Sequence, residues 1–138
     1  MRFGAFVTAF GISLAAGLAV AADSTPGARV YFINMANGAH VRSPVLVQFG
    51  LSGMGVAPAG STNPNTGHHH LIIDADTPPA GVPIPMDERH RHFGGGQTEV
   101  SVQLTPGTHT LQLVLADGGH IPHTPPVVSE RITITVEP

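Results

Sequence analysis

Apolar and polar residues alternate with a period of two in several short segments after residue 28. The clearest are 45–51, 97–104, 109–116 and 130–137. Such alternation places the apolar side chains on one face of a β-strand. The sequence also contains 13 Pro and 17 Gly, which disfavour long helices. A fold built from strands is therefore predicted.

Two further strands are expected at 29–34 and 68–74, which makes six short strands separated by turn residues. This pattern predicts an all-β fold, an immunoglobulin-like antiparallel β-sandwich. Pro106 and Gly107 resemble the turn at which immunoglobulin-like and fibronectin-like chains cross between sheets. His109 lies near the place where a Tyr often bridges that corner. The residues expected in the core are Val47, Phe49, Val102, Leu111, Leu113, Ile132 and Ile134.

The N-terminal residues have the pattern of a secretory signal peptide. Arg2 precedes a long apolar run, and Ala19, Val20 and Ala21 fit an A-x-A cleavage site. We therefore expect a signal peptide at 1–21, a short linker at 22–28 and a single β-sandwich domain at 29–138. The expected location is periplasmic or secreted, with no membrane insertion after cleavage.

Charge and cysteine content exclude several function classes. The chain without its signal peptide has five basic residues, all Arg, against nine acidic ones, a net charge of −4 with His neutral. Without a basic patch, nucleic acid and anionic lipid are poor partners. With no Cys, the chain has no disulfide, no catalytic thiol and no Cys-based metal site.

The nine histidines are the unusual feature of the composition. Most lie near two long expected loops, 53–67 and 75–96, and loops of that length are usually functional or disordered. In a strand, His68 and His70 would share one face and His69 would point to the other. His90 and His92 have the same spacing, and His120 and His123 lie in a Pro-rich loop that could fold over the site.

We therefore expect a metal site drawn from six histidines: His68, His70, His90, His92, His120 and His123. Imidazole nitrogen suits copper, zinc and nickel, and Cu(II) binds most tightly, so copper ranks before zinc as the expected ion. Because free His titrates near pH ~6.5, metal affinity should fall as the pH drops through about 6.

Other residues near these segments have competing interpretations. His109 is expected to be a hydrogen-bonded corner residue and His40 a solvated turn residue, whereas His69 is balanced between core packing and ligation. Asp74 and Asp117 could orient a metal-bound imidazole or simply form turns. Met54 or Met86 could offer one axial thioether. The Gly94–Gly96 run indicates a flexible or closely approached turn.

No G-x-S-x-G or H-E-x-x-H motif is present, so we expect a binding domain rather than an enzyme. The predicted function is binding of a transition metal for storage, delivery or sensing in the cell envelope. The alternative is a module that binds an envelope protein or a glycan and whose histidines pin its loops. A metal-dependent enzyme with an open coordination position is a third class.

Five segments together resemble a family of exported bacterial domains of unknown function, the DUF4399 type. They are 41–60, 65–74 (NTGHHHLIID), 92–99 (HFGGGQTE), 106–115 (PGTHTLQLVL) and 120–126 (HIPHTPP). The resemblance covers nearly the whole chain after the signal peptide. It implies a single periplasmic domain, but it implies no activity and transfers no functional residue.

Overall fold

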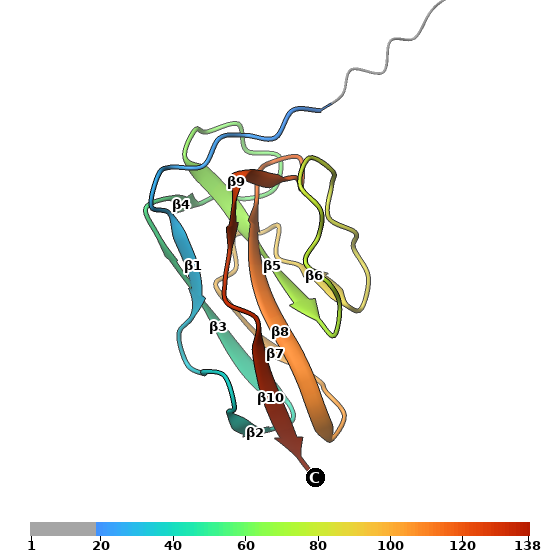
Figure 1. Ribbon diagram of the computed structural model, residues 1–138. Helices are drawn as coiled ribbons and strands as arrows, with labels where there is room; N and C mark the ends of the chain where they lie inside the picture. Colours follow the sequence, from blue (N-terminus) through green and yellow to red (C-terminus); the bar gives the residue numbers. More distant parts are fainter. Residues whose placement is uncertain (1–18) are drawn as a thin grey trace, which may run out of the picture.

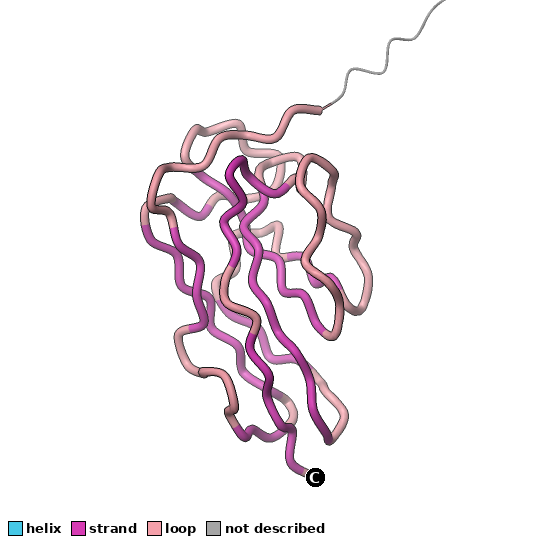
Figure 2. Tube along the Cα trace, in the orientation of Figure 1, coloured by secondary structure: helices cyan, strands magenta, loops and turns pink. Residues whose placement is uncertain are grey.

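The structure is a computed structural model, and it describes residues 19–138. The described chain forms ten β-strands joined by turns and loops (Figures 1 and 2). These strands are β1 (Arg29–Phe32), β2 (His40–Arg42), β3 (Val45–Ser52), β4 (Gly55–Val56), β5 (Thr66–Ile73), β6 (His90–His92), β7 (Glu99–Val102), β8 (Gly107–Ala116), β9 (Pro122–Val128) and β10 (Ile132–Glu137). Most of the expected signal peptide, 1–21, lies outside the described residues. No helix in the described part of the chain is long and apolar enough to cross a membrane.

The strands form two sheets. The small sheet has the order β1-β3-β7, and the large sheet has the order β2-β10-β8-β5-β4, with β6 paired to β5 and β9 paired to β8. Most neighbouring strands are antiparallel, whereas β2–β10 and β4–β5 are parallel pairs. The predicted all-β fold with antiparallel sheets is confirmed.

One apolar core joins the two sheets. Each of the seven residues predicted in the core is buried, with at most 3% of its surface exposed. The alternation explains this result, because Val45, Val47 and Phe49 of β3 lie in the same buried cluster as Leu111 and Leu113 of β8. Burial of these apolar side chains is the main stabilising contribution to the fold.

The chain crosses between the sheets at the predicted corner. β7 pairs with β3 in the small sheet, and β8 pairs with β5 and β10 in the large sheet. Gly107 begins β8 with a φ of 128°, a conformation that a residue with a Cβ rarely adopts. The sequence at 106–107 thus marks the change of sheet.

The segment 122–128 is a strand, β9, and the prediction of a Pro-rich loop there was wrong. β9 pairs with β8 through Val127 and Val128 and, after a register shift, through Pro122. Proline has no N–H to donate and is tolerated in a strand at a sheet edge or at an irregularity. Strands β2, β4 and β6 were not predicted, because two or three residues are too few to show a period.

The outer face of the large sheet is also covered around β5. Ile84, in the loop between β5 and β6, packs against Ile72 of β5 and against Val114 and Ala116 of β8. Figure 1 shows this loop folded beside β5 and β6. Because the inner face of β5 contacts the core and its outer face lies under this cover, residues 67–73 are all buried.

Candidate metal centre

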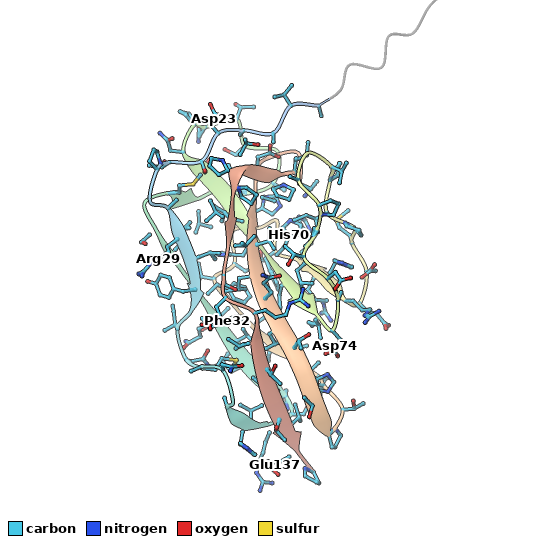
Figure 3. The ribbon with its side chains drawn as sticks, viewed as in Figure 1. Asp23, Arg29, Phe32, His70, Asp74 and Glu137 are labelled. Carbon is cyan, nitrogen blue, oxygen red and sulfur yellow. The ribbon has the colours of Figure 1, made fainter. Side chains whose placement is uncertain are left out.

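Four histidines from three parts of the fold meet on the outer face of the large sheet. They are His68 and His70 of β5, His92 at the end of β6, and His120 in the turn between β8 and β9. One ring nitrogen from each lies within 4.8 Å of those of the other three. The label on His70 in Figure 3 marks the place of this cluster, far from Glu137 at the C-terminal end of the molecule.

Strand geometry brings three of the four together. His68 and His70 are two residues apart on β5, so their side chains share a face. β6 runs antiparallel to β5 with His92 directly opposite His70. Directly opposite residues have their side chains on the same face of the sheet. The sequence pattern at 68–70 and the register of β6 therefore fix three rings side by side.

A tight turn after β8 supplies the fourth ring. His120 has a φ of 65°, and its N–H donates to the carbonyl oxygen of Asp117 at 2.9 Å. The Oδ1 of Asp117 accepts hydrogen bonds from the N–H groups of Gly119 at 2.8 Å and Ile121 at 3.1 Å. Ile84 of the covering loop donates its N–H to the carbonyl oxygen of His120 at 2.8 Å. The turn thus holds His120 over β5.

The rings are in direct contact. His68 Nε2 lies 3.0 Å from His70 Nε2 and 3.1 Å from His120 Nδ1. The His92 and His120 rings are nearly perpendicular, with centroids 4.7 Å apart and an interplanar angle of 73°. His68 and His70 are fully buried, whereas His92 and His120 are partly exposed. The latter two therefore form the side of the cluster nearest to solvent.

Burial keeps the inner imidazoles neutral. Loss of hydration, followed by repulsion from His92 and His120, lowers the pKa of His68 to about 4. Loss of hydration and the neighbouring His68 lower the pKa of His70 to about 3. Burial and His120 also lower the pKa of His92. Proton competition at His68 and His70 therefore begins well below the pH of about 6.5 at which free histidine titrates.

The donor set fits a transition-metal ion. His68 Nδ1, His70 Nδ1 and His92 Nε2 are buried without a hydrogen-bond partner among the described residues. A neutral imidazole has one N–H and one lone pair. The short contacts of His68 and His70 are made by their Nε2 atoms, so the rings together carry more polar nitrogens than the protein satisfies with hydrogen bonds. A cation held by four imidazole nitrogens would use the lone pairs that converge on the cluster.

Two of the six predicted ligands lie elsewhere. His90 of β6 lies opposite Ile72 of β5, and its Nδ1 lies 2.8 Å from Asp87 Oδ1. His123 is buried in β9, with its Nδ1 3.3 Å from the Leu115 carbonyl oxygen and its Nε2 3.0 Å from that of Thr66. Both ring nitrogens of His123 face backbone carbonyl oxygens, one on β5 and one on β8. The ring therefore links these two strands, which is a structural role.

The remaining histidines are separate from the cluster. His69 points into the core, where its ring centroid lies 5.2 Å from that of Phe49. The expected corner role of His109 is confirmed, since its Nδ1 lies 2.7 Å from Asp74 Oδ2 and its Nε2 lies 2.8 Å from the Thr105 carbonyl oxygen. His40 is exposed beside Glu137, at the opposite end of the molecule.

The predicted supporting residues also separate. Asp74 orients His109 rather than a histidine of the cluster, whereas Asp117 shapes the turn that carries His120. Met54 packs against the main core and Met86 is 64% exposed.

Gly94 is a supporting residue that the sequence indicated only as a closely approached turn. A Cβ at Gly94 would lie 2.3 Å from His92 Cε1 and 2.5 Å from its Nε2. Glycine at this position therefore allows the His92 ring to lie against the backbone. Ile84, which packs on the outer face of β5 and whose N–H binds the His120 carbonyl oxygen, was not predicted at all. Its signal was a lone apolar residue between two prolines, and that signal has no periodicity.

Comparison with known proteins gives a family but no functional assignment. A family model described as a domain of unknown function, DUF4399, matches residues 47–137. The matched region contains all four histidines of the cluster. No curated protein and no solved structure matches the chain.

Proposed function

Because the chain belongs to the DUF4399 family, whose description assigns no activity, we propose a function from its own residues: it binds one transition-metal ion through His68, His70, His92 and His120. The observation that carries the proposal is the convergence of four ring nitrogens within 4.8 Å from three separate elements. His68, His70 and His92 belong to paired strands, so of the four rings only His120 is placed to pin a loop.

The chemistry of the donors ranks copper before zinc. Metal–imidazole bonds of about 2.0 Å place neighbouring nitrogens about 3.3 Å apart in a tetrahedron and about 2.8 Å apart in a square plane. The two shortest contacts, 3.0 and 3.1 Å, lie between these values. The order of affinities for nitrogen ligands then favours Cu(II) over Zn(II). The chain has no Cys, so the cluster has no thiolate ligand for Cu(I), and Met54 packs in the core.

We further propose that this binding takes place in the cell envelope, because residues 1–21 have the pattern of a signal peptide. There, a single buried site fits storage, delivery or sensing of the ion. All four protein ligands are imidazoles, and the two partly exposed ones, His92 and His120, leave a path by which the ion can enter and leave.

Titration of single variants tests the proposal. The parent should bind one equivalent of Cu(II) more tightly than Zn(II), and His70→Ala and His120→Ala should each lose this stoichiometric site. His90→Ala and His40→Ala are the matched controls and should bind like the parent. His123→Ala should lower the thermal stability while the folded fraction still binds the metal.

The pH dependence adds a second arm to this experiment. Since burial lowers the pKa of His68 to about 4 and that of His70 to about 3, stoichiometric Cu(II) binding should persist at pH 5. Equal, weak binding of Cu(II) by the parent and by the single variants His70→Ala and His120→Ala would contradict the proposal. It would leave the loop-pinning module as the function, in which case those variants would lose stability without any metal.

A further inference from the structure

The segment before β1 is attached to the domain at Ala22. The N–H of Ala22 donates to Asp117 Oδ2 at 3.0 Å, and its carbonyl oxygen accepts the N–H of Thr124 at 3.0 Å. Ser24 then donates its N–H to the Thr124 carbonyl oxygen at 2.9 Å. Residues 22–24, which the sequence presents as a linker, thus lie along β9, at the end of the molecule marked by Asp23 in Figure 3. Val20, just upstream, is 89% exposed.

Asp117 is a buried carboxylate that lacks a cationic partner. Only 8% of its surface is exposed, and its three hydrogen bonds come from the backbone N–H groups of Ala22, Gly119 and Ile121. The ion pairs in the described part of the chain all involve other carboxylates. A buried charge without an opposite charge is costly, and proteins normally pair it.

Cleavage at the expected site would supply the missing charge. An envelope peptidase that adds water across the Ala21–Ala22 peptide bond leaves a carboxylate on Ala21 and an α-ammonium group on Ala22. We propose that this new ammonium group forms an ion pair with Asp117 and thereby fixes the turn that carries His120. Removal of the signal peptide would then complete the fold next to the histidine cluster.

The surroundings of Ala22 suit a charged terminus. An open pocket of about 530 Å³ lies beside it, and Asp117, Gly118 and Gly119 form part of its wall. The ammonium group can therefore donate one N–H to Asp117 while water solvates the other two. The ion pair requires cleavage after Ala21 but does not require a metal.

The absence of Lys makes the test selective. In a protein that begins at Ala22, the α-amino group is the only aliphatic amine. We would produce residues 22–138 from a fusion whose removal leaves Ala22 first, and follow acetylation by an active ester at pH 7 by mass spectrometry. An ammonium group must lose its proton before it can react, and an ion pair with Asp117 opposes that loss. Acetylation should be at least about tenfold slower in the folded parent than in Asp117→Asn.

Asp23→Asn is the matched control, because Asp23 is an exposed carboxylate of the same segment, and it should react like the parent. A variant that begins at Ala21 moves the amine away from Asp117 and should react fast even if Asp117→Asn does not fold.

Acetylated parent should melt about 4 °C or more below the unmodified protein. Equal acetylation rates in the parent and the Ala21-started variant, or an unchanged melting temperature after acetylation, would overturn the proposal. An exported protein whose sequence starts beyond Asp23 would also overturn it.

Discussion

The protonation of each clustered histidine is set by what surrounds its ring. His70 has the deepest environment, with His68, His92 and His120 all close, and its pKa falls to about 3. Neutral rings repel a metal ion less than imidazolium rings and offer their lone pairs without first losing a proton. At the residue scale, burial therefore prepares the cluster for a cation.

The position of His92 depends on the neighbouring glycine. We expect Gly94→Ala to displace the His92 ring, because the new Cβ would lie 2.3 Å from His92 Cε1. Displacement of one of four ligands should weaken Cu(II) binding about tenfold or more. Gly95→Ala is the control, since its Cβ would meet only the flexible Gln97 side chain, at 3.1 Å. Affinities from competition titrations that are equal in the two variants would show that His92 is not a ligand.

His69 is expected to lower the free energy of unfolding relative to an apolar residue at the same position. Both of its ring nitrogens are buried without a hydrogen-bond partner in the described structure, and its ring packs on Phe49. His69→Leu removes two unsatisfied polar atoms at similar volume, so we expect the free energy of unfolding to rise by about 1–3 kcal/mol. Denaturant unfolding at pH 7 measures it. A loss of stability greater than about 1 kcal/mol would mean that the ring has a polar partner in solution.

At the scale of elements, β5 connects the core to the candidate site. Its inner residues, His69 and Leu71, face the core, whereas His68 and His70 face the cluster on the other side. β8 pairs along nearly the whole of β5 and positions the turn that begins at Asp117. The histidine cluster is therefore anchored to the most extensively paired part of the large sheet.

A hydrogen-bonded pair, Asp74 after β5 and His109 near the start of β8, links these two strands. Burial lowers the pKa of His109, but its hydrogen bonds to Asp74 and to the Thr105 carbonyl oxygen outweigh this effect and raise the pKa above 6.5. Burial raises the pKa of Asp74, but the Thr110 N–H and His109 outweigh it and lower the pKa below 3.8. The imidazolium form can donate from both ring nitrogens, whereas the neutral form can donate from only one.

The sign of the pH effect follows from these shifts. The contribution of His109 is fully present below its unfolded pKa and is lost as the pH rises through its folded pKa, above 6.5. That of Asp74 is lost as the pH falls below 3.8. His109→Gln should therefore cost about 1–2 kcal/mol near pH 5 and progressively less at alkaline pH, as measured by urea unfolding at several pH values. A cost that does not change with pH would contradict the ion pair.

The sequence predicted the strands that bury one face and missed those that are short or irregular. Alternation at 45–51 and 130–137 leaves one arrangement of each strand that buries its apolar face, whereas β4 and β6 are too short to show a period. Spacing alone also placed His90 and His92 together. Spacing gives the face of a strand on which a side chain lies but not the register of two paired strands. The register of β5 with β6 puts His92 opposite His70 and His90 opposite Ile72. The prolines of β9 hid the strand that carries His123.

At the scale of the whole molecule, the cluster joins three parts of the chain that are distant in sequence. A bound ion would connect β5, β6 and the turn after β8 and would stabilise the folded state by mass action. Free Cu(II) at one hundred times its dissociation constant should add about 2.7 kcal/mol to the free energy of unfolding. Thermal unfolding with and without a chelator measures this gain, and a gain of the same size in His70→Ala would show that the ion binds elsewhere.

X-ray absorption of the copper-loaded protein tests the central claim most directly, because it reports the atoms bound to the metal. The sample is the chain from Ala22 with one equivalent of Cu(II) at pH 7. We predict a shell of nitrogen atoms at about 2.0 Å with the outer-shell scattering of four imidazole rings, reduced to three rings in His120→Ala. A shell dominated by oxygen, or one whose imidazole count is the same in the parent and in His120→Ala, would contradict the four-histidine site.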